Sequence, residues 1–260
     1  MPLRNYLPKS VSTALFGDRD RWGTVADQND PMWKDWLFRL EEIYRATQRS
    51  GIGKLVNNAG YPVLRRVDLS GKVVLEIGPG DLPHTPHWNG KPSRYIAVDQ
   101  SGEFLQVTTK KLGDIDCETI LVDESAFSLP LEDHSVDVVL TFYNLEHLTP
   151  LDTYLAELRR VLRPDGVLVG CVPAEGGLAW GIGRRLTTYR WFAANTKIDL
   201  MKVICWGHPN FADDIVSQLD RHFQRSLIEY WPMRLPSIDA NLVLSFVYLP
   251  RASRSDRGRE

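Results

Sequence analysis

Two carboxylates and a glycine turn in this 260-residue chain have the types and the spacing to build a ligand site. Glu76 lies in the apolar run Val73–Ile77, the turn Gly78-Pro79-Gly80 follows, and Asp99 ends a second apolar run. Glycines let a ligand approach the backbone, and a carboxylate at the end of the second strand accepts hydrogen bonds from ribose hydroxyls. The pattern is therefore typical of a βαβ unit that binds an adenosyl group.

The residues around the turn argue against a dinucleotide as the ligand. Pro83 occupies the third position of the Gly-x-Gly-x-x-Gly pattern, and Pro86 leaves room for only a short helix or none. A pyrophosphate needs backbone N–H groups at a helix start, and Asp81 and Glu76 would repel it. The two carboxylates instead suit a cationic ligand without phosphate. S-adenosylmethionine, with its ammonium and sulfonium groups, is such a ligand, and a nicotinamide oxidoreductase is disfavoured.

Five motifs in order resemble those of the class I S-adenosylmethionine-dependent methyltransferases, in particular the small-molecule group. They are residues 74–80, Asp99, residues 121–130, residues 136–147 and residues 157–168, and the resemblance covers about residues 70–173. Leu82 departs from the pattern, because many members have a third glycine there, and so does the proline-rich stretch that follows. These departures concern the helix after the turn rather than the cofactor.

The resemblance implies a role for each cofactor residue. Glu76 and the backbone of Gly78, Pro79 and Gly80 would line the methionine portion, and Asp99 would bind the ribose hydroxyls. The other residues of this set lie beside the ribose or adenine (Gln100), at the adenine amino group (Asp123, or Glu124 if the register differs by one) and near the transferred methyl (Phe142 and Tyr143). The alternative for Asp123 and Glu124 is a solvated loop pair.

Methyl transfer to a hydroxyl group benefits from a general base. His147, just past the predicted strand 136–142, is the first candidate, although a structural role is a strong alternative. Tyr143 is a second candidate and His208 a weaker one, with a capping or surface role as its alternative. His84 and His87 have a spacing compatible with metal ligands, but no third ligand is in view, so no metal is predicted.

Arginine and aromatic residues gather in the segment after the fifth predicted strand. Arg184, Arg185, Arg190 and Trp191 could form a lid over an acidic or sugar-like acceptor, because arginine binds carboxylates in a bidentate way and tryptophan stacks on rings. The alternative is a solvated helix face with Trp191 packed beneath it. The aromatic stripe of residues 33–44 is interpreted as core.

The elements that must position these residues follow from hydrophobic periodicity. We expect an α/β, Rossmann-like methyltransferase fold with a mostly parallel seven-stranded sheet, an antiparallel edge strand, N-terminal helices and an insertion after strand five. The predicted regions are an N-terminal helical extension or lid (1–67), the cofactor-binding domain (68–250) with a substrate lid (174–207), and a disordered tail (251–260). Predicted strands are 73–77, 95–98, 119–122, 136–142, 167–172, 226–230 and 242–249. The helix signals are a start at Asp30-Pro31, a stop at Gly51, a helix over 103–112, a capping box from Thr149 to Asp152 and a helix over 209–223.

The composition excludes several classes of protein. Lys plus Arg number 31 against 33 Asp plus Glu, so the basic excess of a nucleic-acid binder is missing. We expect no membrane span, no secretory signal and, from three scattered cysteines, a reducing cytoplasm. The prediction is methyl transfer from S-adenosylmethionine to a small polar acceptor, at oxygen of a glycan or natural-product-like molecule. The alternatives are a non-catalytic binding or assembly protein of the same fold, or an N-methyltransferase.

Overall fold

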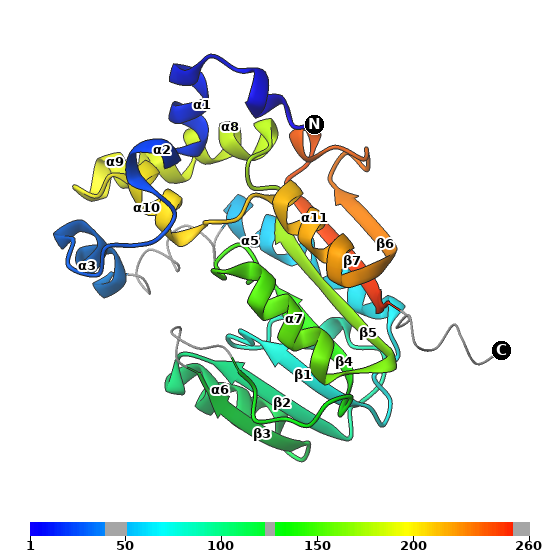
Figure 1. The fold of residues 1–260 in the computed structure, drawn as a ribbon. Coiled ribbons are helices and arrows are strands. Elements are labelled where there is room, and N and C mark those ends of the chain that lie inside the picture. Colours follow the sequence, from blue (N-terminus) through cyan, green and yellow to red (C-terminus); the bar gives the residue numbers. More distant parts are fainter. Residues whose placement is uncertain (40–50, 123–127, 252–260) are drawn as a thin grey trace.

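A computed structural model of the chain describes residues 1–39, 51–122 and 128–251. Its centre is a seven-stranded sheet in the order β3-β2-β1-β4-β5-β7-β6 (Figure 1). The five strands β1 to β5 are parallel, and β7 runs antiparallel to both β5 and β6, so the predicted fold class is confirmed. The strands are β1 (Val73–Ile77), β2 (Arg94–Asp99), β3 (Asp116–Leu121), β4 (Val136–Phe142), β5 (Leu162–Pro173), β6 (Phe223–Trp231) and β7 (Val243–Pro250).

The parallel register brings the predicted cofactor residues to one edge of the sheet. Ile77 in β1 pairs with Val98 in β2, so the glycine turn and Asp99 leave neighbouring strands side by side. Ile77 also pairs with Thr141 in β4, which places the end of β4 on the other side of the turn. Ligands of parallel α/β sheets bind at this carboxyl edge.

Alternation along the strands gives the sheet two apolar faces. In β1, Leu75 and Ile77 pack on the face covered by α7 (Leu151–Val161) and α11 (Ala212–His222). Val74 packs on the opposite face. That second face is covered by α5 (Gly51–Asn58), the 3-10 turn η2 (Tyr61–Arg66) and α6 (Gly102–Leu112).

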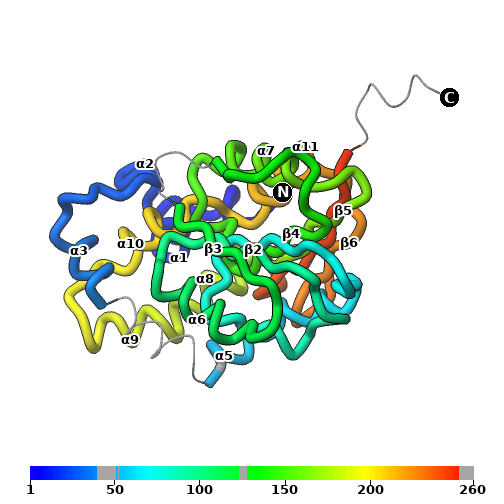
Figure 2. Tube along the Cα trace, turned by 90° about the horizontal axis from the view of Figure 1, so that it is seen from below, coloured from blue at the N-terminus to red at the C-terminus, as the bar shows by residue number. Residues whose placement is uncertain are grey.

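Two segments distant in sequence combine into one helical cap, shown in blue and yellow in Figure 1. Its core includes Trp33, Phe192, Val203 and Trp206, which join the N-terminal helices to the insertion after β5. Figure 2 shows the cap to one side of the sheet. Its elements are η1 (Leu3–Tyr6), α1 (Lys9–Phe16), α2 (Arg19–Trp22), α3 (Pro31–Phe38), α8 (Leu178–Leu186), α9 (Thr188–Asn195) and α10 (Leu200–Gly207).

Several local predictions can be compared with the structure. The Asp30 carboxylate caps α3 by accepting hydrogen bonds from two backbone N–H groups, as expected. The capping box was wrong, because Pro150 caps α7 without a side-chain bond and Asp152 pairs with His222 at 2.8 Å. Gly51 is the first residue of α5, and the segment that it was predicted to end lies outside the described residues. The helix expected over 209–223 begins later, at Ala212.

Some predictions fall on residues outside the described ranges. They are the end of the aromatic stripe (40–44), Asp123 and Glu124, and the tail from residue 252 on. Within the described residues, no helix is both long and apolar enough to cross a bilayer.

Candidate cofactor and acceptor site

The turn after β1 needs glycine for two different reasons. Gly78 has φ +68°, and a Cβ there would come within 2.0 Å of the Asn144 amide nitrogen, which donates to the Ile77 carbonyl at 2.8 Å. Gly80 has φ +53°, but a Cβ there would meet no atom of the described residues within 4 Å. Asn144 therefore fixes the first half of the turn, while the second half leaves space in which a ligand can reach the backbone.

The loop keeps a glycine-like backbone at Leu82, the position where the sequence departs from the family pattern. Leu82 has φ 51°, in the left-handed region that glycine favours, and its side chain is 1% exposed. The strain of about 1–2 kcal/mol is offset by burial of the side chain. A 3-10 turn, η3 (Thr85–His87), replaces the usual helix, so the prediction of a short or absent helix is confirmed.

Glu76 and His84 form a buried network that anchors this loop. The Tyr95 hydroxyl donates to Glu76 Oε2, and His84 Nε2 lies 2.8 Å from Glu76 Oε1. Trp88 Nε1 donates to His84 Nδ1 at 2.9 Å. An indole N–H can only donate, so Nδ1 accepts and the proton is on Nε2, which donates to Glu76.

This network gives His84 the role that the sequence left open. Both Glu76 oxygens are engaged within the protein, so its contact with the methionine portion stays a prediction. The sequence contained one signal for this role, because a histidine and a tryptophan, His84 and Trp88, follow Glu76 in the loop after the strand. No described group of three His, Cys, Asp or Glu side chains is arranged to hold a metal ion.

Asp99 lies at the end of β2 beside the turn. Its Oδ1 accepts from the Ser101 backbone N–H at 2.8 Å. Burial raises the pKa of Asp99, backbone hydrogen bonds oppose the shift, and the Glu76 charge adds to it. Gln100 is exposed. Its position and that of Asp99 fit a ribose at this edge.

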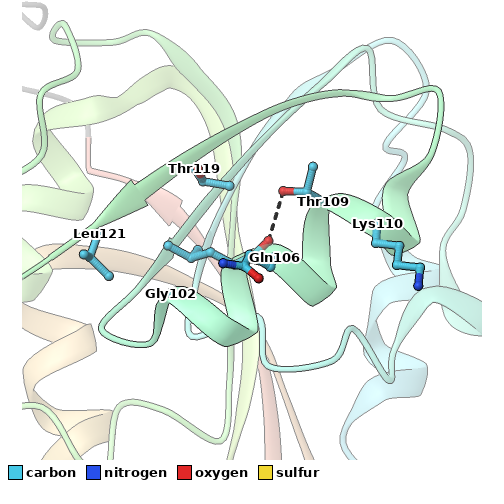
Figure 3. A pocket seen from close by; sticks show the side chains of 7 residues that line it. Gly102, Gln106, Thr109, Lys110, Thr119 and Leu121 are labelled. Atoms are coloured by element: carbon cyan, nitrogen blue, oxygen red, sulfur yellow. Dashed lines mark hydrogen bonds between the residues drawn. The ribbon is translucent and has the colours of Figure 1, made fainter.

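A groove of about 490 Å³ lies between α6 and β3, near the same end of the sheet (Figure 3). Among the described residues, its lining contains none of the predicted site residues. It runs from Gly102 and Leu121 toward Thr109 and Lys110, along the outer side of the sheet edge. The candidate site therefore lies at the carboxyl ends of the strands and not in this groove.

Phe142 and Tyr143 leave β4 with different roles. The Phe142 ring stacks on the His84 ring at 5.1 Å, so it continues the loop anchor. Tyr143 has φ 52°, and its hydroxyl donates to the Val56 carbonyl at 3.0 Å and accepts from the Gly60 N–H at 3.2 Å. Burial raises the pKa of Tyr143 well above its usual range. These bonds give Tyr143 a positioning role, and its catalytic role stays a prediction.

Glu175, just past β5, is a buried carboxylate that the sequence analysis missed. Its Oε2 accepts from Arg184, from Trp180 Nε1 at 3.0 Å and from His208 Nδ1 at 3.0 Å. Burial alone would raise the pKa of Glu175, but the Arg184 charge and the His208 hydrogen bond hold it well below its usual range. Its place directly after a predicted strand was the signal in the sequence.

The four residues predicted to bind the acceptor lie in different surroundings. Arg184 is buried and points into the Glu175 network. Arg185 and Arg190 are exposed, and the Arg185 guanidinium lies 3.7 Å over the Tyr189 ring. Trp191 packs on the cap core.

The structure brings His147 and His208 together. Their ring centroids are 4.6 Å apart in an edge-to-face arrangement. His147 Nδ1 lies 2.5 Å from the Gly207 carbonyl oxygen, which can only accept, so the proton is on Nδ1. The neighbouring Glu146 is buried, and this burial raises its pKa to about 8, with the Glu175 charge adding to the shift and its own backbone N–H opposing it. Its carboxyl is therefore mostly protonated at neutral pH.

Comparison with known proteins agrees with this geometry. The family described as "Methyltransferase domain" matches residues 75–170. An uncharacterized methyltransferase-like protein of Schizosaccharomyces pombe is 35% identical over 127 residues, which are 48% of this chain and 44% of that protein. A ubiquinone/menaquinone biosynthesis C-methyltransferase of Hahella chejuensis is 32% identical over 130 residues, 49% of each chain. The chain thus spans about half the length of these curated relatives or less.

A solved structure shows the same fold. The SAM-dependent methyltransferase from Aquifex aeolicus aligns with a TM-score of 0.54 at 16% identity, covering 81% of this chain and 98% of that one. The family and the fold imply S-adenosylmethionine as the cofactor. Together with the strand order and the glycine turn, the match identifies residues 75–170 as a methyltransferase domain of the class I, S-adenosylmethionine-dependent family.

Proposed function

We propose that the protein transfers a methyl group from S-adenosylmethionine to an oxygen atom of a small polar acceptor, such as a glycan or a natural-product-like molecule. The observation that carries the proposal is the open turn at Gly80 beside Asp99 on the neighbouring strand. Asp99 would accept hydrogen bonds from the ribose hydroxyls, and the backbone at Gly80 would approach the methionine portion.

The surroundings of the turn support a cationic cofactor. Glu76 and Asp99 supply negative charge at two adjacent strand ends, and the Asp81 carboxylate lies in the turn. When bound, S-adenosylmethionine would supply an activated methyl group. The protein would contribute mainly position and a site shielded from water, with the cap as the proposed lid.

The ends of β4 and β5 favour an oxygen acceptor. Two histidines, His147 and His208, lie there as candidate bases for the proton of a hydroxyl group. The similarity to a C-methyltransferase does not choose the acceptor atom, so the proposal rests on these side chains.

Calorimetry with S-adenosylmethionine tests the cofactor half of the proposal. We expect the wild-type protein to bind, and Asp99→Ala to weaken the affinity by about 10–100-fold through lost ribose hydrogen bonds. Asp116→Ala is the matched control, because Asp116 lies at the opposite end of the sheet and is exposed. If the wild-type protein did not bind S-adenosylmethionine, or if Asp99→Ala bound it with equal affinity, the proposal would be contradicted.

A further inference from the structure

We infer that His208 is the general base of this site, that Glu175 positions it, and that the acceptor presents a hydroxyl group. The inference rests on the proposed methyl transfer and names the base and the acceptor chemistry of that same site. It reverses the order expected from sequence, in which His147 came first.

In both histidines Nε2 is the candidate basic nitrogen, but the Nδ1 proton is donated to a different acceptor in each. His208 donates from Nδ1 to the Glu175 carboxylate at 3.0 Å, and His147 donates from Nδ1 to the Gly207 carbonyl. In both rings, Nε2 keeps a lone pair that can take a proton. A buried carboxylate stabilises the resulting imidazolium more than a neutral carbonyl does, so His208 is the stronger base.

Glu175 is itself held rigidly. Its carboxylate is 0% exposed, and donors from Trp180 and Arg184 on α8 bind its Oε2 atom. Arg19 on α2 donates to the His208 carbonyl at 2.6 Å, which fixes the backbone of the histidine. The charged or titratable groups that face His208 are thus Glu175, Arg184, Arg19, His147 and, behind His147, Glu146.

Both histidine rings can be reached from outside. The His208 side chain is 19% exposed and that of His147 is 47% exposed. The interior of the network, in contrast, holds polar atoms that are fully buried and have no hydrogen-bond partner among the described residues. They are Glu175 Oε1, Arg184 Nη1 and Glu146 Oε2.

A hydroxyl group is the acceptor that this base suits. It carries a proton that Nε2 of His208 can take, whereas the buried charge of Glu175 is already paired with Arg184.

The proposed transfer needs only the acceptor hydroxyl, His208 and S-adenosylmethionine. The hydroxyl proton passes to Nε2 of His208 as the hydroxyl oxygen forms its bond to the methyl carbon. The carbon–sulfur bond breaks, its electron pair stays on sulfur, and S-adenosylhomocysteine leaves. The positive charge moves from the sulfonium to the His208 imidazolium, where Glu175 compensates it.

Nuclear magnetic resonance of the full chain with ¹⁵N-labelled histidine, in the presence of S-adenosylhomocysteine, tests the base directly. We expect the proton of neutral His208 on Nδ1, and a titration midpoint that falls by about one pH unit or more in Glu175→Gln, because an opposite charge is removed. His208→Gln assigns the signals. A proton on Nε2, or a midpoint that Glu175→Gln leaves in place, would overturn the inference.

Turnover separates this inference from the proposed function. The probe is release of S-adenosylhomocysteine with a panel of p-nitrophenyl glycosides and simple phenols. We expect His208→Gln to lower kcat by about 100-fold or more while cofactor binding by calorimetry is unchanged. In Glu175→Gln, the acidic limb of the pH–rate profile should move to lower pH as the plateau falls.

Two further variants give the matched comparisons. His222→Gln is the control, because His222 also pairs with a carboxylate, Asp152, but at the C-terminal end of α11. It should keep wild-type turnover. A greater loss in His147→Gln than in His208→Gln would overturn the choice of base, and no release with any panel member would overturn the hydroxyl acceptor. If the wild-type protein still bound the cofactor in the same experiments, the proposed use of S-adenosylmethionine would stand.

Discussion

The central sheet buries apolar side chains on two continuous faces, whereas the helical cap joins two distant segments around a small core rich in tryptophan. The cofactor residues belong to the sheet and its loops. The residues proposed to act on the acceptor lie where the cap meets the sheet.

Charged contacts join the two regions at several points. Arg4 in the cap makes two hydrogen bonds, 2.7 and 2.9 Å, to Asp213 at the start of α11, and Arg184 pairs with Glu175. The Phe211 ring lies between the guanidinium groups of Arg4 and Arg19, at 4.0 and 3.3 Å. Strand packing therefore fixes the geometry around the cofactor, while the acceptor side depends on how the cap docks.

Replacing Arg184 should give the largest effect and should act on the cap. Arg184→Met leaves the Glu175 carboxylate buried without its main cationic partner, which costs about 3–5 kcal/mol in unfolding free energy. Urea unfolding followed by tryptophan fluorescence measures it, because Trp22, Trp33, Trp36, Trp191 and Trp206 all lie in or against the cap core. Arg185→Met, on the exposed face of the same helix, should change stability by less than about 0.5 kcal/mol. Equal losses in the two variants would contradict the division between the regions.

The two glycines of the cofactor turn should respond differently. Gly78→Ala places a Cβ against Asn144 at a positive φ, so we expect a loss of about 2–4 kcal/mol in unfolding free energy. Gly80→Ala meets no atom, so only backbone strain of about 1–2 kcal/mol remains. Its main effect should be weaker binding of S-adenosylmethionine in calorimetry. If Gly80→Ala bound the cofactor like wild type, the open side of the turn would not be the ligand side.

Glu146 should make stability depend on pH. Burial raises its pKa from 4.5 to about 8, so between these values the folded protein holds a proton that the unfolded chain has lost. The stability contribution is fully present below about pH 4.5 and is lost as the pH rises through about 8. We expect wild type to lose about 3–4 kcal/mol between pH 5 and 8 from this group.

Urea unfolding at several pH values measures this dependence. The slope should flatten in Glu146→Gln, which keeps the shape without the charge. Glu103→Gln, at an exposed position on α6, is the control and should retain the wild-type slope. Parallel curves for wild type and Glu146→Gln would contradict the burial argument.

The smallest effect is a gain of stability in the cap. Gly183 lies inside α8, and a Cβ there would meet nothing within 4 Å. Gly183→Ala should therefore stabilise the helix by about 0.5–1 kcal/mol. Thermal unfolding by fluorescence checks it, and a destabilised variant would show that this face of α8 is covered.

Local patterns predicted the parts of the fold that local chemistry controls. The strand 136–142 was predicted at its observed bounds, and the Asp30 cap was confirmed. The capping box at Thr149 failed because Asp152 finds its partner in His222, 70 residues away. Leu82 was identified as a departure, but only the structure shows that its backbone still adopts the glycine conformation.

The amino-acid sequence by itself determined the strands, the glycine turn and the strand-end position of Asp99, because apolar alternation and glycine act within a few residues. Only the tertiary structure decided the acceptor side. Glu175 and His208 are 33 residues apart, and Arg19 reaches the His208 carbonyl from 189 residues away. Their meeting depends on the docking of the N-terminal helices against the insertion, which no local periodicity encodes.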